Sequence, residues 1–242
     1  MKKVTILLIL VGMLVSQSVE DILKRVDNNT VVTTAQYKAT MIISLAGKVR
    51  EKTFFGYTEG KDRAYMEFTA PARDHGTRIL KRGDEIWIYL PSVEKATKIA
   101  GHMLRQSMMG SDFSYEDVAE NRKLEELYDA ENLGIDTIDN RPCYKLRLTA
   151  KVAEVTYALR VVWIDIDEYI ALKTELYAKS GKLMKEVMVG EFQNIGGRNY
   201  PTRMEMINKL RQNTYTELIL DDVRLDITIP DRIFTKAHLE RQ

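Results

Sequence analysis

The stretch YKATMIISLAGKVREKTFFGYTE, residues 37–59, decides the fold of this 242-residue chain. Between residues 37 and 45 every second side chain belongs to one apolar series, a period of two that is typical of a β-strand with one buried face. The Ala-Gly-Lys sequence at 46–48 is a turn signal, and beyond it Phe55 and Tyr57 share one face of a second strand. The stretch therefore predicts a β-hairpin.

The same alternation recurs along the rest of the chain. Turn signals separate the alternating stretches, for example Gly-Asp at 83–84, Ser-Gly at 180–181 and Gly-Gly at 196–197. We count roughly ten or eleven strands and one clear helix. The further strands are expected at residues 63–68, 76–82, 85–91, 143–150, 157–165, 170–179, 183–195, 202–210 and 214–222. Such a succession of hairpins predicts an antiparallel meander and not a series of βαβ units.

The expected fold class is mainly β, a single curved antiparallel sheet that forms a half-open β-barrel. One short N-terminal helix is expected in the sequence VEDILKRVDNN, where apolar residues recur at helical spacing. Its apolar stripe is formed by Val19, Ile22, Leu23 and Val26. No linker and no internal repeat divides the sequence, so residues 19–242 are expected to form one domain.

Composition and charge exclude several classes of function. The 36 Lys and Arg residues balance 35 Asp and Glu residues, so no strong field is expected to attract nucleic acid. The single cysteine, Cys143, forms no intramolecular disulfide, and we expect it to be a small buried strand residue. The three histidines at 75, 102 and 238 lack the paired spacing of a metal or catalytic motif. No metal site is therefore expected.

The N-terminus predicts export. Two lysines precede the apolar run VTILLILVGMLV, residues 4–15, and small residues follow at Ser16 and Ser18. This arrangement is typical of a secretory signal peptide, which we place at residues 1–18. A membrane span needs roughly 20 apolar residues, and a retained anchor is the alternative. The mature protein is expected to be soluble and periplasmic or otherwise extracytoplasmic.

The predicted inward faces of the strands carry almost no charge. They are interpreted either as a packed sheet core or as an apolar cavity that binds a ligand. The 11 methionines suit a surface that repacks around varied apolar ligands, and a partly open barrel of this kind holds one small lipid or acyl chain. The candidate ligand-binding residues on the strands are Met41, Ile43, Phe55, Met66, Phe68, Ile79, Ile86, Ile88, Leu172, Leu176, Met204 and Met206.

The segment SMMGSDFSYED, residues 107–117, follows neither a helix nor a strand period. Three interpretations are open: a surface loop, a catalytic loop whose carboxylates act as acid and base, or a mobile cover over an apolar cavity. Ser114 and Asp117 have the spacing of a capping box, and the acids are expected to face outward and keep the segment soluble. The cover would contact ligand and the barrel rim through Met108, Met109 and Phe113.

Two further features carry a family resemblance. Residues 76–101 form a strand pair that ends in Trp-x-Tyr-x-Pro and continues into a basic strand, and residues 107–118 are close to the motif S-F-M-G-S-D-F-S-Y-E-D, with Met108 where phenylalanine is usual. The closing stretch, residues 220–239, is similar as well, including its Asp-x-x-Phe-Thr ending. This pattern resembles the LolA-like class of outer-membrane lipoprotein-sorting proteins, from about residue 19 onward.

The resemblance implies a half-barrel around an apolar cavity, covered by helices and loops, that carries lipid or acylated lipoprotein cargo through the periplasm. It implies an inner-membrane exporter and an outer-membrane acceptor as partners. Neither a cofactor nor nucleic acid is expected, and no catalytic residue is assigned because we do not expect an enzyme. The alternative function is a periplasmic lipid-responsive sensor of the same fold.

Overall fold

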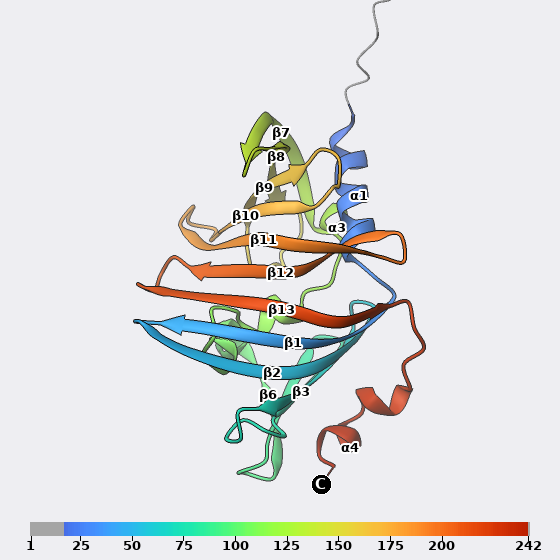
Figure 1. The fold of residues 1–242 in the computed structure, drawn as a ribbon, viewed down its shortest axis with the longest axis vertical. Coiled ribbons are helices and arrows are strands. Elements are labelled where there is room, and N and C mark those ends of the chain that lie inside the picture. Colours follow the sequence, from blue (N-terminus) through green and yellow to red (C-terminus); the bar gives the residue numbers. More distant parts are fainter. Residues whose placement is uncertain (1–16, 242) are drawn as a thin grey trace, which may run out of the picture.

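The framework of the protein is one antiparallel sheet of 13 strands (Figure 1). It is seen in a computed structural model that describes residues 17–241, so the predicted signal peptide up to residue 16 lies outside the described residues. The strands are β1 Thr34–Leu45, β2 Lys48–Glu59, β3 Arg63–Ala70, β4 Arg78–Arg82, β5 Glu85–Leu90, β6 Lys95–Ile99, β7 Tyr128–Ile138, β8 Arg141–Ala150, β9 Leu159–Asp165, β10 Ala171–Tyr177, β11 Leu183–Ile195, β12 Arg198–Asn208 and β13 Thr214–Leu225.

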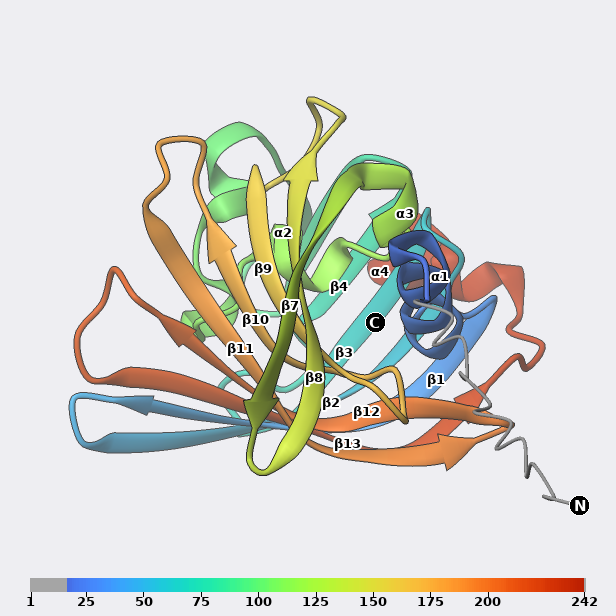
Figure 2. The same ribbon diagram turned by 90° about the horizontal axis from the view of Figure 1, so that it is seen from above.

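Strands that are consecutive in sequence are neighbours in the sheet, and the first and last strands meet in its middle. The order runs from β6 to β1, then to β13 and on through β12 to β7. Figure 2 shows the strong curvature of this sheet. Among the described residues the two outer strands, β6 and β7, do not pair with each other, which confirms the half-open barrel. The sequence missed β7, because its side chains are mostly exposed and show no alternation.

Helices cover the concave side of the sheet. They are α1 Val19–Thr30, η1 Gly101–Arg105, η2 Met108–Gly110, α2 Tyr115–Ala119 and α3 Leu124–Leu127. The apolar stripe of α1 is buried as predicted, and it packs on β8 and β9 at Leu146, Leu148 and Val162. No helix within residues 17–241 is long and apolar enough to span a membrane.

The C-terminal arm, residues 226–241, lies on the opposite, convex face of the sheet. It contains η3 Asp231–Phe234 and α4 Lys236–Leu239, which lie beside β3 in Figure 1. Three apolar side chains of the arm pack against Tyr65, Leu80 and Tyr89 of β3 to β5. The His238 ring lies 5.0 Å from the Tyr65 ring. These contacts bury a second apolar layer outside the barrel.

Two predicted inward residues face outward instead. Phe55 packs with the outer cluster below the C-terminal arm, and Phe54 is the inward residue. Gly56 sets this phase of β2. The Tyr37 ring packs over it on the inward face, where a β-carbon would approach the ring to 2.5 Å, so the neighbouring Phe55 points outward. Leu172 packs with Trp163 on the outer face, since a bulge between residues 171 and 173 changes the phase of β10.

The contact between α1 and α3 provides one test of the fold. Buried Asp27 accepts hydrogen bonds from the backbone nitrogens of Leu124 at 2.9 Å and Glu125 at 3.1 Å, and so caps α3 from another helix. We expect Asp27→Ala to lower the free energy of unfolding by about 1–2 kcal/mol, because both amides lose their acceptor. Urea unfolding measures this effect. Asn28→Ala, at an exposed position of the same helix, is the control, and an equal loss there would contradict the assignment.

Docking of the C-terminal arm should depend on pH. The pKa of His238 is lowered from 6.5, first by burial and then by Arg241. Because the docked arm binds the proton more weakly than the free arm does, docking is complete above pH 6.5 and weakens as the pH falls below it. Hydrogen exchange of residues 227–239 on both sides of pH 6.5 measures the change. His238→Asn should make the protection factors, which correct the exchange for its intrinsic pH dependence, independent of pH in this range, and an unchanged pH dependence of protection in that variant would refute the role of His238.

Candidate functional site

The segment of residues 107–117 folds back on itself as a closed loop on the concave side of the sheet. The Met108 nitrogen donates to the Phe113 carbonyl at 2.7 Å, and the Ser111 hydroxyl donates to the Met108 carbonyl at 2.7 Å. Met109 and Gly110 both adopt positive φ, 53° and 84°, in the turn between them. Glycine suits this conformation, because it has no β-carbon. We call residues 101–119 the cover.

Asp112 ties the cover to the middle of the sheet. Its carboxylate is fully buried and accepts hydrogen bonds from the hydroxyls of Thr214 and Thr216 on β13, each at 2.9 Å. The Thr216 hydroxyl also accepts the Asp112 backbone N–H at 2.9 Å, and the Arg211 guanidinium lies 3.7 Å from the carboxylate. A buried carboxylate is costly unless it is paired and hydrogen-bonded, and here the sheet provides the partners. This set of contacts is named the Asp112 latch.

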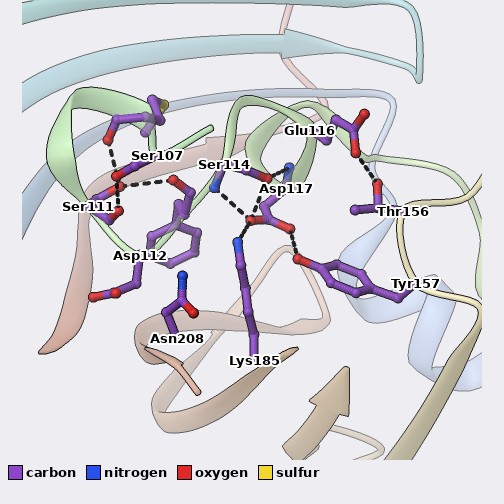
Figure 3. Close-up of polar contacts among 12 residues, drawn as sticks. Ser107, Ser111, Asp112, Ser114, Glu116, Asp117, Thr156, Tyr157, Lys185 and Asn208 are labelled. Atoms are coloured by element: carbon purple, nitrogen blue, oxygen red, sulfur yellow. Dashed lines mark hydrogen bonds and ion pairs between the residues drawn. The ribbon is translucent and has the colours of Figure 1, made fainter. Parts of the chain in front are cut away.

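A second latch is formed by Asp117 (Figure 3). Its carboxylate accepts hydrogen bonds from Ser114, whose side chain caps α2 in the predicted capping box. The same carboxylate accepts the Tyr157 hydroxyl at 2.7 Å and forms a close ion pair with Lys185 of β11. Burial and Asp117 both raise the pKa of Tyr157, which keeps its hydroxyl protonated as the donor. Residues from three parts of the chain therefore meet at this carboxylate.

The orientation of the acids differs from the prediction. Asp112 and Asp117 do not face solvent to keep the cover wet, since their side chains are 0% and 6% exposed. Glu116 is also engaged, because it accepts the Thr156 hydroxyl at 2.8 Å. The short spacing of acids in the segment carries no information on burial, and the threonine and lysine partners lie far away in sequence. Asp112 and Asp117 therefore point inward and hold the cover on the sheet.

The underside of the cover is apolar. Met108 is fully buried against the concave face of β1 to β5, and Met109 lies at the border of the same cluster. Phe113 is buried within the closed loop. The predicted residues that this cluster brings together are Met41, Ile43, Met66, Phe68, Ile79, Ile86 and Met108, with Ile88 and Met109 beside them. Their contact with a ligand stays a prediction, because in this closed state they contact one another.

A cavity remains on the concave side, between α1 and strands β9, β10 and β12. Its volume is about 340 Å³. Among the predicted residues Met204 lines it, while Met206 and Leu176 are buried in the neighbouring strands. One side of the cavity is mainly apolar and the other carries charge. The charged side is formed by Asp27, Glu120, Arg122 and Arg160.

A wider cleft of about 660 Å³ opens beside the cover and meets this cavity at one ion pair. Glu120 and Arg122 line both hollows. The Arg122 guanidinium donates to Glu120 at 2.8 Å and 2.5 Å, and also to the Glu154 carbonyl at 2.8 Å. The pair therefore lies at the boundary between the outer cleft and the inner cavity.

Two charged residues on the inward face were missed by the sequence analysis. Arg160 of β9 donates to the Tyr128 hydroxyl at 2.9 Å, and its guanidinium lies 4.8 Å from the centre of that ring. Lys81 of β4 lies beside the cover and donates to the Ala119 carbonyl at 2.6 Å, and burial lowers its pKa. The alternation of the strands offered a signal for both residues. Arg160 lies two positions from the inward residue Val162, and Lys81 lies two positions from the inward residue Ile79, so each belongs to the inward face of its strand.

The arrangement contains no group of ligands suited to a metal. Within residues 17–241 no three His, Cys, Asp or Glu side chains lie together as a metal site requires. The two buried acids of the cover are occupied by hydroxyl and lysine partners from the sheet. The site is therefore a latched cover over an apolar face, with a small cavity next to it.

Comparisons with known proteins agree with this geometry. A family model whose description is "Uncharacterized protein" matches residues 60–241. A DUF1329 family protein from Desulfovibrio piger is 28% identical, with a TM-score of 0.83 over 90% of this chain and 96% of that one. A LolA superfamily protein from Nitrosomonas europaea is 25% identical, with a TM-score of 0.77 over 92% and 100% of the two chains.

A third solved structure shows the same fold. It is a domain from Vibrio parahaemolyticus that is described under the name of outer membrane lipoprotein sorting, 23% identical, with a TM-score of 0.80 over 91% of this chain and 97% of that one. A search of curated proteins found no match.

The open sheet and its latched cover define a protein of the LolA-like fold. The family match over residues 60–241 covers most of the chain, and the resemblance seen in the sequence is confirmed. The chain belongs to the family whose model, described as "Uncharacterized protein", matches residues 60–241, and it shares the fold of the LolA superfamily structure from Nitrosomonas europaea.

The Asp112 latch can be tested directly. We expect Asp112→Ala to lower the free energy of unfolding by about 2–3 kcal/mol, because two buried threonine hydroxyls lose a charged acceptor. Amide exchange in residues 107–114 should accelerate more than exchange in β1. Glu116→Ala is the matched control in the same segment, with a side chain that is 21% exposed, and it should cost less than about 1 kcal/mol. Equal effects of the two changes would contradict the latch.

Proposed function

We propose that this protein is an exported carrier that binds an acyl chain of a lipid or lipoprotein and shuttles it between membrane components. The observation that carries the proposal is the construction of the cover: an apolar underside held on the sheet by polar contacts at its ends. Met108 provides the apolar contact, while Asp112 and Asp117 provide the polar ones. An acyl chain has the chemistry needed to take the place of the methionine.

The cavity indicates the size and polarity of the cargo. Ligand pockets usually measure roughly 300–1,000 Å³, so a closed-state cavity of about 340 Å³ suits one chain and not a whole phospholipid. Val162 and Met204 line its apolar side, and the Arg160 guanidinium lies at its charged side. We place the acyl chain along the apolar side and the polar end of the cargo near Arg160 and Arg122.

Loading requires the cover to open. The latches are hydrogen bonds and ion pairs, whose net contribution is small when water replaces them, whereas each buried methylene of a ligand contributes roughly 0.8 kcal/mol. A bound chain therefore offsets the loss of the Met108 contacts, and the threonine and lysine partners remain on the sheet for reclosure. On this scheme binding needs no covalent step.

We base the route of the cargo on the resemblance to lipoprotein-sorting proteins. An inner-membrane exporter would supply the acylated cargo and an outer-membrane acceptor would receive it, with the protein in the periplasm between them. The solved structure from Vibrio parahaemolyticus is described as lipoprotein-sorting, which supports this route for a chain of the same fold. The predicted signal peptide at residues 1–18 is consistent with it.

Filling the cavity tests the proposal. Thr174 lines the cavity from β10, and Thr174→Phe should occupy the space of the acyl chain. We expect fluorescent fatty-acid binding to weaken about tenfold or more, with a melting temperature close to that of the unmodified protein. Thr149→Phe, at an exposed position of β8, is the matched control and should bind normally. Normal binding by Thr174→Phe would exclude this cavity as the acyl site.

A further inference from the structure

Three hairpin turns lie side by side at one end of the sheet. They join β1 to β2, β10 to β11, and β12 to β13, and in Figure 2 they project together at the left. Backbone hydrogen bonds connect them: Ala46 donates to the Asn213 carbonyl at 2.9 Å, and Lys209 donates to the Met184 carbonyl at 2.9 Å. We call residues 46–50, 178–182 and 209–213 the basic tips.

The charge of the basic tips has one sign. Their sequences, AGKVR, AKSGK and KLRQN, contain six basic residues and no acidic residue. The turns at the opposite end of the sheet, residues 60–62, 83–84, 139–140 and 166–170, contain only one basic residue, Lys61. Their acidic residues are Asp62, Asp84, Asp139, Asp167 and Glu168. These two sets of turns therefore carry net charges of opposite sign.

Apolar side chains stand exposed among these basic residues. Val49 is 65% exposed, Leu210 is 46% exposed, and Tyr215, at the start of β13, is 39% exposed. Val49 and Tyr215 lie on the two sides of Ser44 in the sheet, because each pairs with it across strands. Large exposed apolar residues grouped in this way mark a surface that meets another apolar medium.

We propose that the basic tips dock this protein on a bilayer that contains anionic phospholipid. Lysine and arginine side chains near such a surface are attracted to the lipid head groups, and aliphatic and tyrosine side chains enter the interfacial region. A bilayer is favoured over an acidic protein because exposed aliphatic and tyrosine side chains stand among the basic residues of three separate turns, a combination that suits the interfacial region of a bilayer.

This inference rests on the proposed carrier function, and the position of the cover supports the connection. Arg211 of the basic tips is the residue that approaches Asp112, and Thr214 of the Asp112 latch directly follows the same turn. A bilayer at the basic tips would therefore lie next to the latch of the cover. The acyl chain would leave and enter the membrane by a short path.

Vesicle sedimentation tests the charge contribution. The variant Lys48→Gln, Lys179→Gln, Lys182→Gln removes three exposed charges and leaves Arg211 and Lys209, which approach Asp112 and Glu186, unchanged. On phosphatidylcholine vesicles that contain phosphatidylglycerol, we expect binding to weaken about fivefold per lysine, or about 100-fold in all. The matched control, with the same net charge, changes three exposed lysines elsewhere and should bind normally: Lys24→Gln, Lys61→Gln, Lys98→Gln.

The apolar contribution has its own pair of variants. Val49→Ser with Leu210→Ser should weaken vesicle binding several-fold, whereas Leu133→Ser with Ile135→Ser, at positions of β7 that are 37% and 63% exposed, should not. A thermal melt of each variant confirms folding. Fluorescent fatty-acid binding without vesicles should be unchanged in all of them, which separates failure of docking from failure of the carrier function.

Three outcomes would overturn the docking surface. They are equal losses in the tip and control lysine variants, equal binding of the unmodified protein to vesicles with and without phosphatidylglycerol, and no binding of it to either. The last result would assign the basic tips to an acidic protein partner instead. Preferential loss in the tip variants, reduced by high salt, would support the bilayer.

Discussion

The structure depends on one constraint: an antiparallel sheet that curves but does not close leaves an apolar concave face that its own strands do not cover. A closed barrel would bury that face by itself, whereas here β6 and β7 remain apart and other segments supply the missing layer. Helix α1 covers the half formed by β7 to β9, and the cover lies on the half formed by β1 to β6. The two halves therefore have separate apolar clusters, with the cavity between them.

The polar contacts explain why the cover has one position. Apolar packing alone is non-directional, and Met108 could be accommodated at several places on a methionine-rich face. A buried carboxylate is different, because it is tolerated only where all its partners are in place. Thr214 and Thr216 fix Asp112, and Lys185 with Tyr157 fix Asp117. The cover thus combines an apolar contact that would fit several positions on the sheet with polar contacts that fix one position.

Sequence reasoning was most successful where a period was long and unbroken. It predicted the β1–β2 hairpin, the buried stripe of α1 and the half-open sheet, because alternation reports burial of one face directly. It was wrong for Phe55, where two adjacent phenylalanines left the phase undecided, and for Leu172, where a bulge changed it. The latches were beyond its reach: Asp112 meets a threonine 102 residues away, and spacing within a motif gives no sign of such a partner.

The pairing of β1 with β13 in the middle of the sheet also governs how the chain reaches its fold. Thr40 pairs with Ile219, so the two half-sheets join through a contact between distant parts of the sequence. Closing so long a loop is slow, and each meander of hairpins forms through much more local contacts. Because Met108 packs on the first half and Asp112 bonds to β13, the cover gains its full set of contacts only after the halves have joined. Completion of the site is thus a late folding event, and the chain must keep its apolar concave faces from aggregating until its last strand has arrived.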